Sequence, residues 1–283
     1  QLLLVGTSME VFLFKEDGTL VPGYPLQRNA LRALVPNLGY PGAYWLQSSS
    51  EIQVVEIRKD PLRPKWQSPD LADSLSRAIR HFQTRDQDLV AGIVNGQTLF
   101  AWDLKGQALF DSIPLETPAV AVPSFQEHPL STRLITPMRD GRVKITSLSG
   151  AGFNLNMNLP GPMEHWAVGD LGGDQRLEYL ATSGNELITM GYQVKDWKLL
   201  FRWQCPGRID DMKVHELPTG TLVSVLDRNQ QRLWLLNARG EVLEGFPVAG
   251  KSIPFVQNHP SQRGYRILTH ADKSAISYHL GGF

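Results

Sequence analysis

The chain has 283 residues, of which 42% are hydrophobic and 20% are charged, and its formal net charge is +0 at pH 7. This composition excludes an extended disordered chain, and the neutral charge excludes a binder of nucleic acid or anionic membranes that relies on non-specific attraction. The single cysteine, Cys205, excludes a disulfide framework and a cysteine-based metal cluster, and no apolar run approaches the roughly 18 residues of a membrane-spanning helix.

Short apolar runs separated by Gly, Asn and Asp clusters predict antiparallel strands along the whole chain. One type of turn is marked by a glycine, at Gly18, Gly106, Gly150 and Gly240, and the separations of 88, 44 and 90 residues are multiples of a period of about 44. The two slots left empty by this spacing hold turn-like residues, Asp60-Pro61 and Lys195-Asp196.

A second type of turn keeps the same interval. We predict these turns at 37–42, 84–88, 126–129, in the loop that begins at Asp170, at His215 to Gly220, and at 257–260. Strands are predicted after them at 43–47, 89–94, 134–136, 177–182, 222–226 and 265–269.

A third strand in each unit precedes the glycine turn, and a fourth follows it, as at Val21–Leu26 and Val242–Val248. Seven third strands can be counted, centred near Phe12, Val54, Phe100, Val143, Ile188, Trp234 and Ile276. Four strands in about 44 residues is the size of one propeller blade. The sequence therefore predicts an all-β fold, a seven-bladed β-propeller of four-stranded antiparallel blades, with residues 1–283 as a single domain.

The first and last predicted blades are incomplete. The chain opens on a second strand, Leu2–Val5, and closes just after a third strand, Ala275–Leu280. The first blade then lacks its first strand and the seventh lacks its fourth. Because proteins usually cover open sheet edges, we expect residues upstream of Gln1 in the native protein to close the ring.

Two motifs carry a family resemblance. The segment G-D-L-G-G-D-Q-R-L-E, from Gly169 to Glu178, resembles the FG-GAP/VCBS repeat, whose fuller form is G-D-x-D-G-D-G-x-x-D/E. The segment A-W-D-L-K-G, from Ala101 to Gly106, is similar to the core of the quinoprotein-like repeat. The resemblance implies propeller architecture and, because such repeats are frequent there, a bacterial envelope or secreted protein with a periplasmic or extracellular location.

The loop from Asp170 to Glu178 has two interpretations. Asp170, Asp174 and Glu178 could supply carboxylate oxygens to Ca²⁺, a cation that takes 6–8 oxygen ligands. In the resembled motif a further acidic residue stands where this chain has Gly172, so the site loses one carboxylate. The alternative is a tight turn in which the Asp side chains accept hydrogen bonds from backbone amides. We expect no cofactor, and Ca²⁺ bound weakly or not at all.

Catalytic signals are poor. The sequence has no G-x-S-x-G elbow, no phosphate-cradling glycine loop and no H-x-x-x-H or H-x-H pattern. His128 and His259 lie three repeat periods apart, which indicates equivalent turn residues and not metal ligands. Cys205 follows a strand in W-Q-C-P-G, where a buried and inert thiol is expected. We therefore predict no enzymatic activity.

One face of the predicted propeller is a candidate binding surface. The loops leading into first strands and the loops between second and third strands share a face, and they carry Arg28, Arg32, Arg77, Arg80, Glu164, His165, Trp166, Arg208, Asp210 and Asp211. We single out Arg77, Arg80, His165, Trp166, Arg208, Asp210 and Asp211 as candidate partner-binding residues. The alternatives are a solvated rim of balanced charges and, for the tryptophans, packing between blades.

The expected function is a non-catalytic interaction or scaffold module, part of a larger bacterial envelope or secreted protein, that binds a protein partner. The alternative is a propeller that binds or processes a sugar or peptide at the channel mouth. Neither nucleic acid nor direct membrane insertion by this segment is expected.

Overall fold

The structure is a computed structural model. It describes residues 2–6, 10–27, 33–36, 43–47, 52–56, 64–67, 79–83, 88–103, 107–126, 132–193, 196–218, 220–258, 264–271 and 274–281. These residues form antiparallel sheets joined by turns, and no residue among them is helical. Within this described part there is accordingly no helix that could cross a membrane. The prediction of an all-β fold is confirmed.

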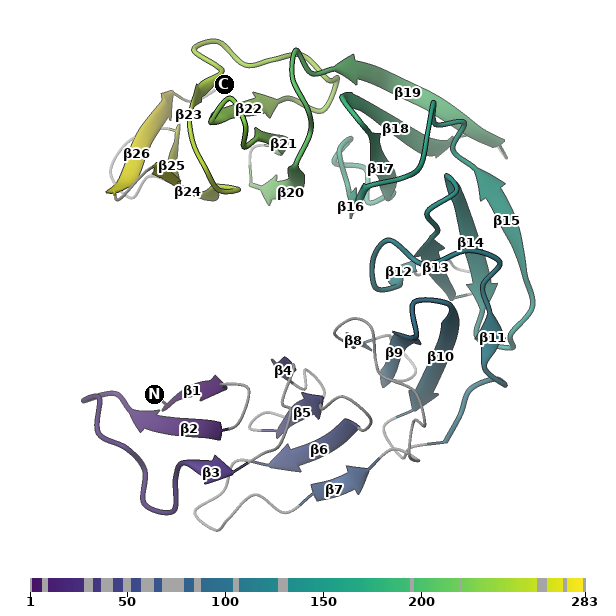
Figure 1. Ribbon diagram of the computed structural model, residues 1–283, viewed down its shortest axis with the longest axis vertical. Coiled ribbons are helices and arrows are strands. Elements are labelled where there is room, and N and C mark those ends of the chain that lie inside the picture. The colour runs from purple at the N-terminus through teal and green to yellow at the C-terminus, as the bar shows by residue number, and fades with distance from the viewer. Residues whose placement is uncertain are drawn as a thin grey trace. The chain divides into compact units, whose positions relative to one another are not determined.

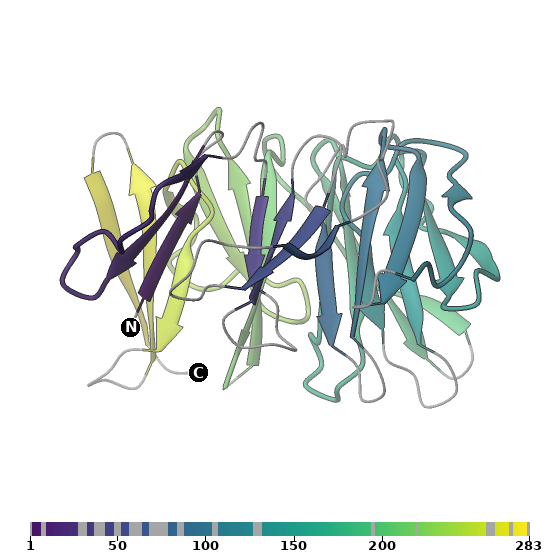
Figure 2. The same cartoon turned by 90° about the horizontal axis from the view of Figure 1, so that it is seen from below.

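The described strands make seven sheets, five with four strands and two with three (Figure 1). Each predicted third strand is a strand of a different sheet: β2 (Glu10–Lys15), β6 (Ile52–Glu56), β10 (Thr98–Asp103), β14 (Arg142–Ser147), β18 (Glu186–Gln193), β22 (Arg232–Leu236) and β26 (Ser274–Gly281). The second strands are β1 (Leu2–Gly6), β5 (Ala43–Gln47), β9 (Asp88–Val94), β13 (Arg133–Pro137), β17 (Glu178–Ser183), β21 (Gly220–Asp227) and β25 (Gly264–Ala271). Figure 2 shows the same strands from below the view of Figure 1.

The remaining strands flank these hairpins. First strands are β4 (Ala33–Pro36), β8 (Arg80–Gln83), β12 (Ser124–Gln126), β16 (His165–Gly169), β20 (Asp211–Leu217) and β24 (Phe255–Asn258). Fourth strands are β3 (Leu26–Gln27), β7 (Pro64–Gln67), β11 (Ile113–Pro114), β15 (Gly152–Asn156), β19 (Asp196–Gln204) and β23 (Val248–Ala249). The sheets β1-β2-β3 and β24-β25-β26 have three described strands, in the order that the sequence predicts. Completion of these two sheets by upstream residues stays a prediction.

The glycine turns are equivalent, as predicted. Gly18 and Gly240 both have φ of 80°, and Gly150 has φ of 85°. In each turn the glycine N–H donates to the carbonyl three residues earlier, at 2.9 to 3.0 Å. That earlier residue donates its own N–H to the carbonyl that follows the glycine, at 2.7 to 2.9 Å. Gly106 lies outside the described residues. In its turn the Asp103 N–H donates to the Gln107 carbonyl at 3.0 Å, which matches the second of these two hydrogen bonds.

The predicted fourth strands Val21–Leu26 and Val242–Val248 are wrong in extent. One isolated bridge stands at the start of each, at Leu20, just before the first segment, and at Val242 in the second, and the regular ladder spans only the two residues of β3 or β23. Between bridge and ladder lies a left-handed glycine, Gly23 or Gly245, followed by a cis X-Pro bond. Because proline has no N–H to donate and a left-handed residue leaves the extended conformation, the ladder is interrupted there.

The turn predicted at His215–Gly220 is also wrong in its bounds. Strand β20 continues through His215 to Leu217, which pairs with Gly220 in β21. The apolar residues Met212 and Val214 and the buried His215 sustain the strand past the predicted turn. The predicted turn at 37–42 lies outside the described residues, and so does the turn at 84–88 except for its last residue. His128, His259 and Lys195 also lie outside them.

The chain divides into two compact units. The first contains residues 1–138 and 143–155, and the second contains residues 139–142 and 156–283. In the second unit the sheet β16–β19 packs against β20–β22 through Leu180, Leu187, Val223 and Val225, none of which is exposed. The sheet that contains β20–β22 packs its other face against β25 and β26 through Leu233, Leu235 and Ile267. Whether residues 1–283 form a single domain stays a prediction.

Candidate functional site

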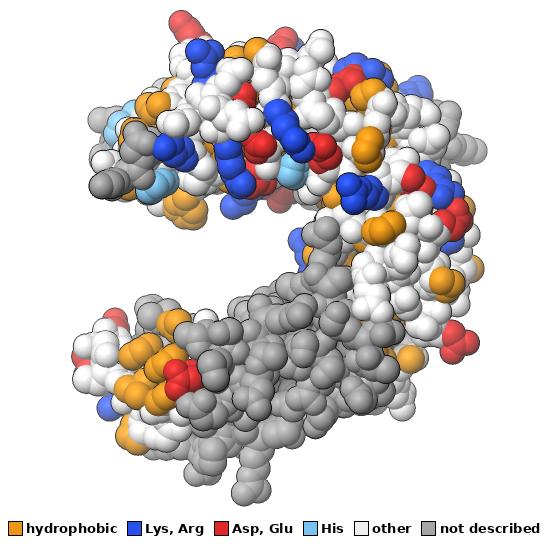
Figure 3. Space-filling view, in the orientation of Figure 1, with side chains coloured by type: hydrophobic (Ala, Val, Ile, Leu, Met, Phe, Trp, Pro, Cys, Tyr) orange, Lys and Arg blue, Asp and Glu red, His pale blue; other side chains and the backbone are white. Residues whose placement is uncertain are grey.

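Three segments of the second unit build the candidate site at one end of their sheets. They are the start of β16, residues 206–211 leading into β20, and the turn between β21 and β22. Figure 3 shows basic, acidic and histidine side chains intermixed over the part of the molecule where Figure 1 labels β16, β20 and β21. The segments belong to the two loop classes that the sequence analysis placed on one face.

Buried anchors hold the segment that carries Arg208. Cys205 and Ile209 are 1% and 0% exposed, and their N–H groups donate to the carbonyls of Asn185 and Gly184 in the β17–β18 turn, at 2.8 and 3.0 Å. Asp210 N–H donates to the Leu226 carbonyl at 2.8 Å. Arg208 lies between these anchors, and its side chain is 60% exposed. The predicted burial of Cys205 is confirmed, and that burial raises the pKa of its thiol.

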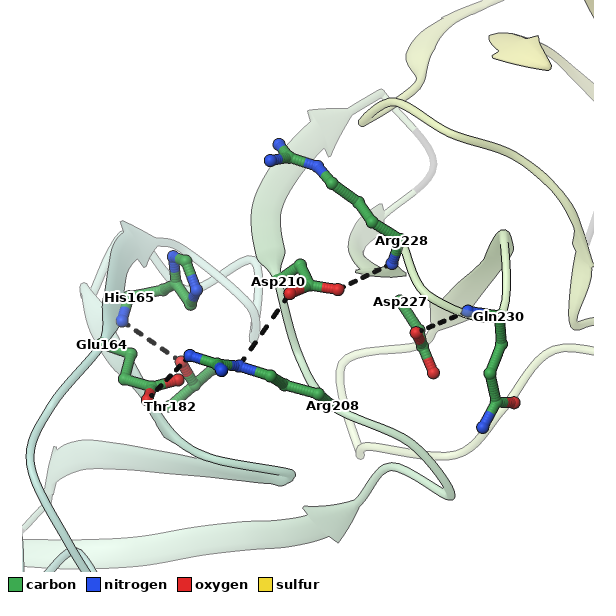
Figure 4. Close-up of polar contacts among 8 residues, drawn as sticks. All are labelled: Glu164, His165, Thr182, Arg208, Asp210, Asp227, Arg228 and Gln230. Atoms are coloured by element: carbon green, nitrogen blue, oxygen red, sulfur yellow. Dashed lines mark hydrogen bonds and ion pairs between the residues drawn. The ribbon is translucent and has the colours of Figure 1, made fainter. Parts of the chain in front are cut away.

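Two arginines and three acidic residues are linked across this face by ion pairs and one backbone hydrogen bond, and Figure 4 draws all of them except Asp211. Arg208 Nη2 donates to Glu164 Oε1 at 3.2 Å, and Arg208 Nε lies 3.9 Å from Asp210 Oδ1. The other carboxylate oxygen of Asp210 accepts the Arg228 N–H at 2.7 Å, and Arg228 Nη2 donates to Asp211 Oδ2 at 3.2 Å. We call Glu164, Arg208, Asp210, Asp211 and Arg228 the arginine cluster.

Exposed ion pairs contribute at most about 1 kcal/mol to stability. Arg208 and Arg228 are 60% and 57% exposed. The ion pairs of the cluster therefore contribute little to the stability of the fold.

Three of the other predicted surface residues, His165, Trp166 and Arg80, make different contacts. His165 starts β16, where its N–H donates to the Thr182 hydroxyl at 3.2 Å. Trp166 is half-buried and stacks on the buried ring of Tyr179, with centroids 5.3 Å apart, so it packs within its sheet. Arg80 belongs to the first unit, where its guanidinium lies 5.8 Å from the Phe82 ring centroid. Arg28, Arg32 and Arg77 lie outside the described residues.

The loop from Asp170 to Glu178 uses its carboxylates as acceptors for its own backbone. Asp170 accepts from the N–H groups of Asp174, at 3.1 Å, and Gln175, at 2.8 Å. The buried Glu178 accepts from Leu171 N–H at 2.7 Å. Burial raises the pKa of Glu178, while the hydrogen bonds from the amides of Leu171 and Gly172 oppose that rise. These contacts are those of the predicted tight turn, and Ca²⁺ binding stays a prediction.

We expect calorimetric titration with Ca²⁺ to show no saturable binding at micromolar concentration. Gly172 removes one ligand of the resembled motif, and the carboxylates of Asp170 and Glu178 already accept loop amides. Sub-micromolar binding that disappears in the Asp170→Ala variant would show that the loop is a calcium site.

Two polar contacts in this unit were not predicted from the sequence. Arg228 was not singled out, although its place in the turn between a second and a third strand is the signal that could have found it. His215 Nε2 lies 2.9 Å from Ser224 Oγ across the β20–β21 pair. Because His215 and Ser224 are 7% and 0% exposed, a substrate cannot reach this histidine–serine pair in the folded protein.

Comparison with known proteins identifies the fold. The sequence matches no protein-family model and no curated protein. The structure of BBS1N in complex with ARL6DN is similar at a TM-score of 0.60 and 13% identity, over 95% of this chain and 83% of that one. Sqt1 from Chaetomium thermophilum is similar at a TM-score of 0.69 and 12% identity, over 97% and 75%.

A third similar structure is the dihydro-heme d1 dehydrogenase NirN in complex with DHE, with a TM-score of 0.63 and 16% identity. The likeness covers 88% of this chain and 55% of that one. All three are β-propeller proteins, and at such low identity the likeness shows the fold alone. The present chain therefore has a β-propeller fold.

Proposed function

We propose that this chain is a non-catalytic β-propeller module that binds a protein partner through the arginine cluster. The observation that carries this proposal is the hydrogen bonding of the two exposed guanidinium groups. Each has five N–H donors, and among the described residues each donates one side-chain hydrogen bond, Arg208 to Glu164 and Arg228 to Asp211. The two side chains are 60% and 57% exposed, and each is paired with an acidic neighbour.

Exposed arginines suit recognition of carboxylates on another protein. Arginine is enriched among the residues that dominate interface energies. The similar structure of BBS1N is a complex with ARL6DN, which supports a protein partner for a propeller of this kind. The burial of the His215–Ser224 pair supports a non-catalytic role.

The finer architecture and context are part of the same proposal. Seven described sheets and the period of about 44 residues support seven blades. The motif from Gly169 to Glu178 supports an FG-GAP/VCBS-like repeat. We propose that the module belongs to a bacterial envelope or secreted protein, because such repeats are frequent there, and that its partner binds in the periplasm or outside the cell.

The test compares charge-reversal variants. The partner is identified by cross-linking in the native source, purified, and titrated against the wild type, Arg208→Glu and Arg228→Glu. We expect each variant to raise the dissociation constant roughly tenfold or more, because each replaces a donor group by a repelling carboxylate.

Arg176→Glu is the matched control. Arg176 is 68% exposed and lies 3.7 Å from Asp174, in the loop between β16 and β17 at the other end of the sheet. Its variant should bind as the wild type does. Equal loss in all three variants, or no loss in the two cluster variants, would contradict the proposal.

A further inference from the structure

An open pocket lies in the first unit, where the segment around β11 meets the turn between β14 and β15. Its volume is about 560 Å³, and it is lined by Ala108, Phe110, Asp111, Ser112, Ile113, Pro114, Ser149 and Gly150. The first six of these residues belong to the segment around β11, and the last two belong to the turn. We call this hollow the Asp111 pocket.

The pocket forms where the last strand of its sheet is interrupted. Ala108 makes an isolated bridge with Trp102, and the regular ladder of β10 resumes only at Ile113, so residues 109–112 lie outside it. On the other side, Phe110 packs against the glycine turn, where a Cβ at Gly150 would lie 3.1 Å from the Phe110 Cβ. The interrupted segment of one sheet and the glycine turn of the next therefore form the two walls.

Asp111 gives the pocket its charge. It is exposed, it is the one ionisable residue of the lining, and within the described part of the chain its carboxylate has no hydrogen bond or ion pair. Because an aspartate carboxylate is one methylene from the backbone, every rotamer keeps the charge beside the walls. A cation in the pocket is attracted by this charge, and an anion is repelled.

The apolar part of the lining suits the stem of a long basic side chain. Phe110 and Ile113 are half-buried, so part of each side chain remains accessible. Lysine and arginine carry their charge on an apolar stem that can lie along such a surface while the charged group stays in water. The stem can contact Phe110 and Ile113 while the charged group lies near Asp111.

The open form of the pocket favours a side chain of another protein over a free small molecule. Most small-molecule sites enclose the greater part of their ligand. Here most of the lining residues are exposed, namely Ala108, Asp111, Ser112, Pro114 and Ser149. An occupant therefore needs further contacts outside the pocket.

The neighbouring strand β15 can supply these contacts. It is the last strand in the order β12-β13-β14-β15, so among the described strands none pairs with its outer edge. Its sequence, G-F-N-L-N, has neither a charge nor a proline to hinder pairing, and Phe153 is 49% exposed. Asn154 donates to Glu116 at 3.1 Å, which places a second acidic residue beside this strand. An extended peptide can add to an edge of this kind.

We propose that the Asp111 pocket receives an arginine or lysine side chain from an extended segment of a partner protein, and that this segment pairs with the outer edge of β15. The charge of Asp111 selects the basic residue, and the β15 edge holds the backbone. This surface lies in the first unit and does not depend on the arginine cluster.

Peptide titration followed by NMR tests the proposal, with acetyl-Thr-Val-Arg-Val-Thr-amide as the probe. We expect it to shift the resonances of residues 108–114 and 149–156. The same peptide with citrulline, the uncharged analogue of arginine, should bind about threefold more weakly, and the peptide with glutamate should bind more weakly still. Butylammonium, which carries the charge without a backbone, should bind at least about tenfold more weakly than the arginine peptide.

Two variants show whether Asp111 is the selecting charge. Asp111→Asn should bind the arginine peptide only as well as the wild type binds the citrulline peptide. Glu244→Gln is the matched control, because the exposed Glu244 lies in the corresponding segment between the bridge at Val242 and β23 and does not line the pocket. Circular dichroism checks that both variants are folded.

Three results would overturn the proposal. The first is the absence of shifts in residues 108–114 with the arginine peptide. The second is equal binding of the arginine and citrulline peptides, or unchanged binding in folded Asp111→Asn. The third is butylammonium binding as tightly as the peptide, which would make the pocket a site for free amines.

Discussion

Replacement of Gly207 by alanine is expected to lower the free energy of unfolding by about 2–3 kcal/mol. A Cβ at this position would overlap the Oδ2 atom of Asp227 and lie 2.9 Å from Gln230 Nε2. Asp227 cannot move away easily, because it is 1% exposed and its Oδ1 accepts the Gln230 N–H at 3.0 Å. Thermal or urea unfolding measures the loss, which corresponds to roughly 5–10 °C in Tm for a protein of this size.

Gly172→Ala is the control for this substitution. A Cβ at Gly172 would have its nearest neighbour, Asp174 Oδ1, at 3.7 Å, an ordinary van der Waals distance. Neither glycine has a positive φ, so the comparison isolates crowding from backbone strain. Because Gly207 directly precedes Arg208, its alanine variant should also weaken partner binding. Equal stability of the two alanine variants would show that the close approach at Gly207 is absent in solution.

The second large effect concerns pH. Burial, and secondarily the charge of Lys213, lowers the pKa of His215 from its ordinary 6.5 to about 4. Between these values the unfolded chain binds a proton that the folded protein excludes, so stability rises with pH across this window. The contribution of His215 is fully present above about pH 6.5 and falls by about 3 kcal/mol as the pH is lowered to about 4.

Denaturant unfolding of the wild type and His215→Gln at pH 7, 6, 5 and 4 measures this contribution. The wild type should lose its advantage over the variant by about 3 kcal/mol between pH 6.5 and 4. Ser224→Ala removes the hydrogen bond to His215 but keeps the buried imidazole, so it should retain the wild-type dependence on pH. An advantage that stays constant over this range, or an imidazole that titrates near 6.5 by NMR, would show that His215 is accessible to solvent.

The sequence predicts the centres of the strands well, because each hairpin carries a local signal. Strand β5 was predicted residue for residue at Ala43–Gln47, and β9 (Asp88–Val94) was predicted at 89–94, one residue short at its start. Apolar alternation and the glycine turns after four of the third strands are short-range features, and their recurrence reinforces them.

The fourth strands were predicted less well. Val242–Val248 has enough apolar residues for a strand, but Gly245 and Pro247 prevent a continuous ladder. The sequence prediction included both residues in a strand. Pro247 has no N–H to donate and Gly245 has a left-handed backbone, so the hydrogen-bonded ladder is interrupted there.

The candidate site could be located from the sequence but not assembled. Arg208, Asp210 and Asp211 are close in sequence; the first two lie directly before β20, and Asp211 is its first residue. The pairing of Arg208 with Glu164, 44 residues away, and of Arg228 with Asp211 depends on which loops lie side by side. Trp166 could not be assigned, because a strand residue faces either solvent or the neighbouring sheet, and a shift of one residue reverses the choice.

The arginine cluster as a partner-binding surface is the central claim, and hydrogen exchange of the complex tests it most directly. Amide exchange is compared between the free chain and the chain saturated with its partner. We predict slower exchange in residues 206–211 and 227–231, which carry the arginine cluster, and unchanged exchange in residues 170–176 and 217–222 at the other end of the sheets. Protection confined to residues 170–176 and 217–222, with residues 206–211 unaffected, would contradict the account.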